Sequence, residues 1–410
     1  MNILFLSQRV PYPPNRGDKI TTWRIVERLA REHRVTIVAF AHDDGDVEAA
    51  RVLRDEKGIE TVTVRHDERR KKAAALPLLL TKKPLTLGVY GSKELQSAVD
   101  ARLGDTDLAY AYSSSMGAFL EGKGVPWVMH FAELDSDKWR QYANEHGFPM
   151  RLVYRREWKT LTAFERRVAD DALTNVFCTP LEEKIFREVI PGPPSTVMRN
   201  GVDLDYYRPD RADAEAGHCV FTGVMDYFPN VNGCEWFADE ILPRVRERVP
   251  GARFTIIGSR PTDEVRALGE REGIEVTGFV DDTRDWLRRG AVSVAPLRVA
   301  RGIQNKVLEA LAMGIPTVGT TPATQGVEGE AGHHFLVADD AASFADGVAG
   351  LLLDEAGAGE LGRRGRAFVE ERYDWDACLS PLDDILRSVR EGGAASHAVK
   401  PEPSPEEASA

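Results

Sequence analysis

Three features that would assign this chain to a class at once are missing: a long apolar run, a close pair of cysteines and an excess of positive charge. The longest apolar stretch, residues 73–80, contains Pro77 and is far too short to span a membrane. The four cysteines are widely spaced, which is typical of reduced thiols rather than of disulfides or a zinc site. The 53 Lys and Arg against 65 Asp and Glu leave a net charge of −12, which argues against a nucleic-acid partner.

The N-terminus also lacks the basic start and cleavage site of a secretory signal, so residues 2–6 are better interpreted as a first strand. We therefore expect a cytoplasmic protein. Its 410 residues, 42% of them hydrophobic, exceed what one typical domain needs and predict two domains with large cores.

Short β-branched apolar runs alternate with stretches of helical period along the whole chain. In the first half the predicted strands are 2–6, 35–40, 60–64, 108–111, 127–130, 172–177 and 195–198, with helices over 20–32, 47–57 and 158–170. In the second half they are 219–222, 253–257, 274–276, 292–295 and 317–319, with helices over 233–249, 283–290 and 305–313. This alternation predicts parallel sheets covered by helices on both faces.

A polar stretch after Pro209 separates the two halves and predicts a domain boundary there. We expect an N-terminal domain over 1–209, a C-terminal domain over 210–390 whose last helix packs back on the first domain, and a disordered tail over 391–410, which is rich in Ala, Ser, Pro and Glu. The fold class is then α/β, with two doubly wound Rossmann-like domains facing a central cleft. Ligands of such sheets bind beyond the carboxyl ends of the strands.

The most informative segment is residues 295–316: a strand, a loop with Gly302, a helix with a polar start, and a second strand. Free amides at that helix start, with Arg301 and Lys306 beside them, predict an anion site. An ordinary strand–helix–strand unit with a charged helix face is the alternative. It leaves unexplained why Arg298, Arg301 and Lys306 crowd one loop.

The same segment resembles the donor-binding motif of retaining glycosyltransferase family 4, which has the GT-B fold. In that family a Glu on this helix holds the nucleotide ribose, and the matching residue is Glu309. The family pattern has a second Glu eight positions earlier, where this chain has Arg301. Segments 221–227, 229–231, 301–306 and 135–139 are more particular: they resemble the sugar transferases associated with PEP-CTERM and exosortase exopolysaccharide systems.

The resemblance implies a set of donor-binding residues. Many family members clamp the diphosphate with an Arg and a Lys shortly after Gly223, but Met225 and Asn230 occupy that stretch. We therefore expect Arg298, Arg301 and Lys306 to replace the clamp, and Arg260 more weakly. The predicted donor-binding residues are Arg16, Gly17, Gly223, Arg298, Gly302, Ile303, Gln304, Asn305 and Glu309.

In the first domain the resemblance points to His130, which ends the strand 127–130 and would lie near the reacting sugar. A buried structural histidine is an equally weighted alternative. Glu133 and Asp135 are expected to contact the acceptor, and the predicted catalytic residues are His130, Arg301 and Lys306. No metal site or cofactor is predicted, because two carboxylates such as Asp135 and Asp137 make a poor isolated site.

Basic clusters flank the apolar residues 76–80, and residues 151–159 add further positive charge. Such clusters on an acidic protein suit docking to an anionic membrane surface, with a solvated loop as the alternative.

These patterns predict a metal-independent hexosyltransferase. It would move a sugar from a nucleotide-diphosphate sugar to a lipid-linked or polysaccharide acceptor, with retention of configuration. A nucleotide-sugar epimerase of the same fold and a non-catalytic nucleotide-sugar-binding protein remain as alternatives.

Overall fold

A computed structural model describes residues 1–300 and 302–392 of the chain. The chain divides into two compact units. Unit 1 contains Met1–Phe177, Ile185–Met198 and the C-terminal segment that begins at Leu379, and unit 2 contains Cys178–Lys184 and Arg199–Cys378. The chain thus passes from unit 1 to unit 2 at Met198, before the polar stretch at which the sequence analysis placed the domain boundary.

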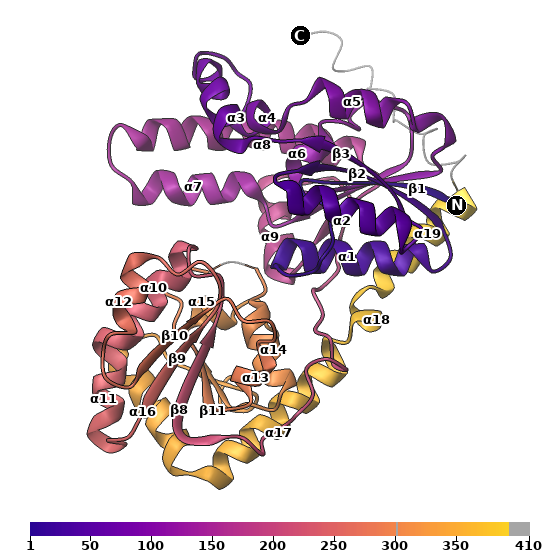
Figure 1. Cartoon of the computed structure of the whole chain (residues 1–410). Coiled ribbons are helices and arrows are strands. Elements are labelled where there is room, and N and C mark those ends of the chain that lie inside the picture. Colours follow the sequence, from indigo (N-terminus) through magenta and orange to yellow (C-terminus); the bar gives the residue numbers. More distant parts are fainter. Residues whose placement is uncertain (301, 393–410) are drawn as a thin grey trace, which may run out of the picture. The chain divides into compact units, whose positions relative to one another are not determined.

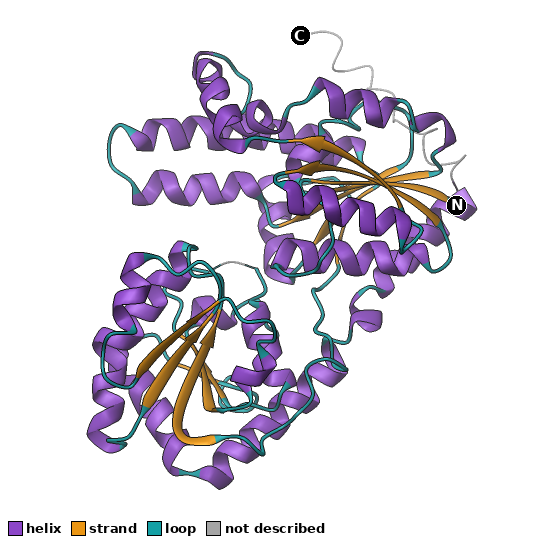
Figure 2. Ribbon diagram, in the orientation of Figure 1, coloured by secondary structure: helices purple, strands orange, loops and turns teal. Residues whose placement is uncertain are grey.

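Unit 1 is built on a seven-stranded parallel sheet with the order β3-β2-β1-β4-β5-β6-β7. Its strands are β1 (Asn2–Ser7), β2 (Arg34–Ala41), β3 (Glu60–Arg65), β4 (Leu108–Tyr112), β5 (Trp127–Ala132), β6 (Thr174–Phe177) and β7 (Ser195–Val197). The central strands are buried along nearly their whole length because helices cover both faces, as Figure 2 shows.

Its helices are α1 (Gly17–Ala30), α2 (Asp44–Asp55), α3 (Glu68–Ala75), η1 (Leu76–Leu80), α4 (Leu85–Tyr90), α5 (Lys93–Asp100), η2 (Leu103–Asp105), α6 (Ser114–Gly117), α7 (Asp135–Glu145), α8 (Met150–Asp171) and α19 (Ser380–Gly392). Asp43 and Ser92 cap α2 and α5 by accepting from backbone amides. Helices α7 and α8 form a long antiparallel pair (Figure 1). In α19, Asp383 accepts a hydrogen bond from Arg28 of α1 at 2.6 Å.

Unit 2 has a six-stranded parallel sheet with the order β10-β9-β8-β11-β12-β13. Its strands are β8 (Glu215–Thr222), β9 (Arg253–Ile257), β10 (Ile274–Gly278), β11 (Gly290–Ala295), β12 (Thr317–Gly319) and β13 (Leu336–Val337). The two-residue strand β13 was not predicted, because a run that short has no periodicity to detect.

The helices around this sheet are α10 (Phe228–Trp236), η3 (Phe237–Ile241), α11 (Leu242–Arg248), α12 (Asp263–Leu268), α13 (Arg284–Leu287), α14 (Asn305–Ala312), α15 (Thr321–Thr324), α16 (Ala341–Leu353), α17 (Glu355–Arg372) and α18 (Trp375–Cys378); α9 (Pro180–Val189) belongs partly to each unit. The single helix predicted over 233–249 is wrong in one respect. It contains the π-helical turn η3, just before Pro243, which cannot donate to the helical ladder and whose ring displaces a carbonyl.

Both sheets have the strand order 3-2-1-4-5-6 of a Rossmann fold, extended by β7 in unit 1. The predicted fold class of two doubly wound parallel-sheet domains is confirmed. No helix among the described residues is long and apolar enough to cross a bilayer. The predicted tail lies, from residue 393 on, outside the described residues.

Candidate functional site

Glycines follow strands β8 and β9 at the carboxyl edge of the unit 2 sheet, beside the point where the strand order reverses. A Cβ built on Gly258 would lie 1.7 Å from the carbonyl oxygen of Gly223, so the loops after β8 and β9 require glycine where they meet. Gly258 also has a φ of +153°. The Gly223 amide donates to Ile257 O at 3.0 Å, and Met225 N donates to Ser259 O at 2.8 Å. The backbone is thereby brought close to the space beyond β8.

A lysine from α14 reaches this edge. Lys306 Nζ donates to Asn230 Oδ1 at 2.6 Å and lies 4.5 Å from the centre of the Phe221 ring. Asn230 is fixed in turn, since its Nδ2 donates to Val224 O at 2.8 Å. Burial lowers the pKa of Lys306 to about 8. The ammonium thus has a neutral hydrogen-bond acceptor in Asn230 and the carboxylate of Glu309 nearby, and it could also receive an anion.

Glu309 lies one turn further along α14, on the same side as Lys306. Burial raises the pKa of this carboxyl, while a hydrogen bond from Tyr207 and the charge of Lys306 oppose the shift. Tyr207 is held by its carbonyl, which accepts from Arg366 Nη1 at 2.6 Å. Arg366 Nη1 also donates to Ala312 O at the end of α14, at 2.6 Å. Glu309 is thus a half-buried acceptor whose position is set by Tyr207.

The loop between β11 and α14 is tightly constrained. Gly302 has a φ of +61°, and a Cβ on Gly326 would lie 2.1 Å from Gly302 O. Arg298 is directed at α10: its Nε donates to Asn232 Oδ1 at 2.9 Å, and its guanidinium lies 5.8 Å from the Trp236 ring. Arg301, predicted to be catalytic, lies outside the described residues.

Three further predicted residues start α14. Gln304 is the N-cap residue, although its side chain makes no capping bond, and Ile303 packs against the apolar core of unit 2. Asn305 Oδ1 is buried and has no hydrogen-bond partner among the described residues. An orphan buried acceptor is costly unless a ligand or water supplies a donor.

In unit 1, His130 is fully buried on β5. Its Nδ1 pairs with the Tyr110 hydroxyl at 2.7 Å, and the Tyr112 ring packs edge-on at 4.7 Å between centroids. Burial lowers the pKa of His130 to about 3, so the ring is neutral. In this arrangement the imidazole has no exposed surface that a substrate could reach.

The acidic residues after β5 lie at the start of α7. Asp135 accepts from the Ser114 hydroxyl, and Asp137 is buried and accepts from Arg140 and Gln141. Glu133 is half-buried in the preceding turn. Asp135 and Asp137 therefore bind different protein groups, and no group of three metal-ligating side chains occurs within 1–300 and 302–392.

The loop before α1 contains Arg16 and Gly17. Arg16 is exposed and its Nε donates to Asp18 Oδ1 at 2.6 Å, while Gly17 is the first residue of the helix. Two residues on, the buried Lys19 already has an anionic partner, Asp46, at 2.7 Å. This loop presents one exposed arginine rather than a built anion pocket.

Unit 2 is a Rossmann-type domain. At its carboxyl edge Lys306, Asn230 and Glu309, with the glycine loops after β8 and β9, form an arrangement that could hold an anionic, hydroxyl-bearing ligand. A phosphate would meet the lysine and the α14 start, and a hydroxyl pair would meet the carboxylate. This is the chemistry of a nucleotide.

Comparison with known proteins is consistent with that class. Residues 216–354 match the family model of glycosyl transferases group 1. The GDP-mannose-dependent alpha-(1-6)-phosphatidylinositol monomannoside mannosyltransferase of Mycobacterium tuberculosis is 26% identical over 54% of this chain and 63% of its own length. The chain thus matches just under two thirds of that relative.

Solved structures cover almost the whole chain. Sucrose-phosphate synthase from Thermosynechococcus elongatus superposes with a TM-score of 0.71 and 16% identity over 95% of this chain and 99% of its own. Anabaena HepE, solved in complex with UDP, has a TM-score of 0.70 and 14% identity over 95% and 100%. Residues 216–354 of unit 2 are thus similar to group 1 glycosyl transferases, and the chain has the two-domain GT-B fold of these solved structures.

Sequence reasoning missed two residues of this site. Asn230 was noted only because it stands where the family has a clamp residue, not as the partner of Lys306, and Tyr207 was given no role. Both contacts join residues far apart in the chain, 76 positions in the case of Lys306 and Asn230, so no local pattern indicates them. Nor does the sequence indicate that Oδ1 of Asn305 is buried without a hydrogen-bond partner among the described residues.

Proposed function

We propose that this chain is a metal-independent glycosyltransferase. It transfers a hexose from a nucleotide-diphosphate sugar to an acceptor, with retention of configuration. The observation that carries the proposal is the Lys306–Asn230 pair at the switch point of unit 2, one helical turn from Glu309. The names of similar proteins, which include a GDP-mannose-dependent mannosyltransferase and a UDP complex, support a nucleotide-sugar donor.

In this proposal each donor group meets a matching side chain. Glu309 accepts hydrogen bonds from the ribose hydroxyls, with Tyr207 orienting the carboxylate. The diphosphate lies at Lys306, the loop of Gly223 and the first amides of α14, where charge and dipole both favour an anion. Asn305 Oδ1, orphaned at present, gains a donor from a sugar hydroxyl.

The main catalytic contribution is stabilisation of the leaving diphosphate. As the bond between the anomeric carbon and the phosphate oxygen breaks, negative charge develops beside Lys306, in a site shielded from water. The acceptor oxygen attacks from the face that the nucleotide leaves, and its proton passes to the departing phosphate. No carboxylate pair spanning the anomeric carbon is needed, unlike in a glycosidase.

The other predicted donor and acceptor residues keep their roles as parts of the proposal, whereas the buried His130 is given no catalytic role. Arg301, which replaces a family glutamate, supplies a second cation for the diphosphate, and Arg16, Gly17, Arg298, Gly302, Ile303 and Gln304 complete the donor contacts. Glu133 and Asp135 of unit 1 contact the acceptor, a lipid-linked or polysaccharide precursor such as exopolysaccharide synthesis uses. The protein then works in the cytoplasm, at the inner face of the cell membrane.

The test is turnover of a donor panel that includes GDP-mannose and UDP-glucose, with and without candidate acceptors. Transfer with retained anomeric configuration, unchanged by EDTA, is the expected result. Donor turnover that needs no acceptor would favour an epimerase, and binding without turnover a non-catalytic protein. Activity lost in EDTA and restored by Mn²⁺ would contradict metal independence.

A further inference from the structure

A segment of unit 1 that plays no part in donor binding exposes large apolar side chains. Leu80 in η1 is 94% exposed and Phe148, just before α8, is 83% exposed. Leu76, Met150 and Leu152 of the same two segments are also exposed. We call residues 69–83 together with 148–159 the lobe face. Helix α8 begins within it, and α3, η1 and α4 lie beside α8 (Figure 1).

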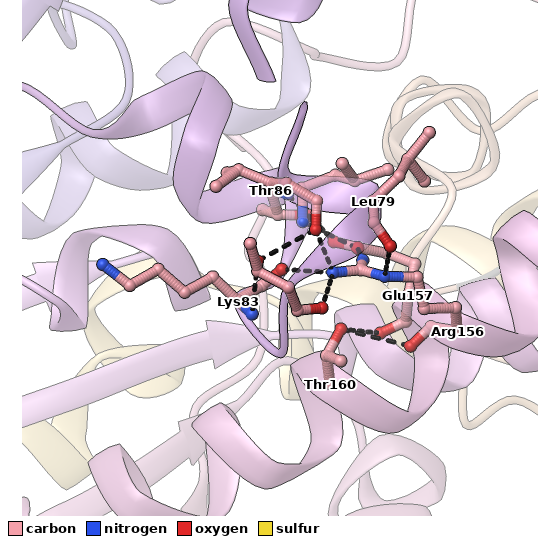
Figure 3. A network of polar contacts seen from close by, with 9 residues as sticks. Leu79, Lys83, Thr86, Arg156, Glu157 and Thr160 are labelled. Atoms are coloured by element: carbon pink, nitrogen blue, oxygen red, sulfur yellow. Dashed lines mark hydrogen bonds and ion pairs between the residues drawn. The ribbon is translucent and has the colours of Figure 1, made fainter. Parts of the chain in front are cut away.

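Arg156 of α8 holds η1 and the turn after it in place (Figure 3). Its guanidinium donates to four backbone carbonyls, those of Leu78 (2.5 Å), Leu79 (3.1 Å), Thr81 (2.6 Å) and Lys83 (2.8 Å). One side chain thus satisfies the backbone of the turn that would otherwise need water. The turn is built onto α8 rather than left to move freely.

The next residue, Glu157, fixes the helix that follows. Its buried carboxylate accepts from Leu85 N at 2.7 Å, Thr86 N at 2.9 Å and the Thr86 hydroxyl at 2.9 Å. Those amides open α4, where an anion is favoured by the helix dipole. Arg156 therefore fixes the end of η1 and the turn after it, and Glu157 fixes the start of α4. Leu80 is thus exposed on a segment that is anchored to α8.

The lobe face is also strongly basic. Residues 69–86 contain six Lys or Arg and no acid, in a chain with a net charge of −12. Lys82 and Lys83 are exposed, and Figure 3 shows the Lys83 side chain extending away from the network of Arg156. The exposed cations of the lobe face are Arg69, Arg70, Lys72, Lys82, Lys83, Arg151, Arg155 and Lys159.

We propose that the lobe face docks on an anionic lipid bilayer, with the apolar side chains of η1 and of the start of α8 inserted between headgroups. Leucines and a phenylalanine interleaved with cations suit a surface that is anionic outside and apolar beneath. Nucleic acid would leave Leu80 and Phe148 in water, and a second copy of this face would bring like charges together. The docking does not depend on sugar transfer.

The experiment is co-sedimentation of the full chain with vesicles, without donor or acceptor. Vesicles of phosphatidylcholine mixed with phosphatidylglycerol should bind the protein, phosphatidylcholine alone should bind it weakly, and salt should weaken binding. Lys82→Gln with Lys83→Gln should lower the partition coefficient roughly 25-fold, about fivefold per charge. Leu76→Ser with Leu80→Ser should lower it about tenfold or more.

Two matched variants control for general effects. Leu353→Ser removes a leucine as exposed as Leu76, at 59%, and Lys184→Gln removes an exposed lysine; both lie outside the lobe face. Neither should change vesicle binding. The proposal is overturned if the protein ignores anionic vesicles, or if lobe-face and control variants bind alike. If the parent protein formed a dimer that the Leu76 and Leu80 variant lost, and did not bind vesicles, the lobe face would instead be a surface for self-association.

Discussion

The two units share one strand order but use their switch points differently. In unit 2 the cation at the carboxyl edge, Lys306, rests on the neutral amide of Asn230 at 2.6 Å. In unit 1 the comparable cation near the first loop, Lys19, is buried and bonded to the carboxylate of Asp46 at 2.7 Å. Lys306 thus has a neutral hydrogen-bond partner, whereas Lys19 has an anionic one.

The difference teaches how to separate a binding cation from a structural one. An ammonium that is desolvated and whose hydrogen-bond acceptor is neutral is under-compensated, and its pKa falls, as that of Lys306 does although Glu309 opposes the shift. Such a group is stabilised when an anion arrives. A buried ion pair such as Lys19 and Asp46 gains nothing from a ligand and loses much when either partner is removed.

The sharpest way to test this comparison is to remove each charge separately. Lys306→Met keeps most of the length of the side chain without its charge, and should lower kcat/KM for the donor by about 10² to 10³. The free energy of unfolding should hardly change, because a partly desolvated charge is removed. Steady-state kinetics and thermal melting measure the two effects.

Lys19→Met is the matched control in unit 1. It leaves Asp46 buried without its cation and should cost about 3 kcal/mol of unfolding free energy. The donor kinetics of the folded protein should stay within about threefold. If both variants lost stability alike and Lys306→Met kept its activity, the distinction between the two lysines would be wrong.

A smaller effect is expected at Glu309. Glu309→Gln keeps the size of the side chain but weakens its acceptance of ribose hydroxyl bonds, so the donor KM should rise about 10- to 100-fold with little change in kcat. Tyr207→Phe removes only the hydrogen bond that orients the carboxylate, and should raise KM less. Unchanged donor kinetics in Glu309→Gln would remove the ribose assignment.

The pKa of Lys306 predicts a pH dependence. Its pKa in the free protein is lowered to about 8, so the ammonium is charged below pH 8 and neutral above it. Donor kcat/KM should therefore fall as pH rises through about 8, approaching tenfold per pH unit. Lys306→Arg, which stays charged, should be less active but flat over this range. A falling limb that persists in Lys306→Arg would assign the titration to another group.

Much of the fold could be predicted because its strands are short, apolar and bounded by turn residues. Predicted strands 253–257 and 317–319 match β9 and β12 without a shift, and the segment that became α14 was found from its glycine loop and polar start. Periodicity and turn chemistry are local properties, so a single sequence carries them. The segment predicted as a helix over 233–249 is helical as far as Arg248, but the helix begins earlier, at Phe228, and contains a π-helical turn just before Pro243.

The site was less accessible to sequence reasoning because its contacts are long-range. Tyr207 is joined to Glu309, and Asn230 to Lys306, only when the strands between them are assembled. The α7–α8 pair was only half found: residues 158–170 were predicted, but α8 begins at Met150. Its first turns are basic and expose apolar side chains, so they lack the one-sided apolar face that signals a packed helix.

The smallest expected effect concerns His130 of unit 1, which was predicted to be catalytic. Its ring is fully buried, neutral and bonded to the Tyr110 hydroxyl at 2.7 Å, which indicates a structural role. His130→Phe preserves most of the ring volume and leaves the tyrosine hydroxyl without its hydrogen-bond partner. The expected loss is about 1 to 2 kcal/mol of unfolding free energy, with donor kinetics within threefold of the parent. Tyr110→Phe breaks the same bond from the other side and should give a similar loss. Because the two residues act through one contact, the double variant should cost less than the sum of the single ones. A catalytic histidine would behave otherwise: His130→Phe would lower kcat about 100-fold or more, Tyr110→Phe would not, and the histidine would then have to leave its buried position during the reaction.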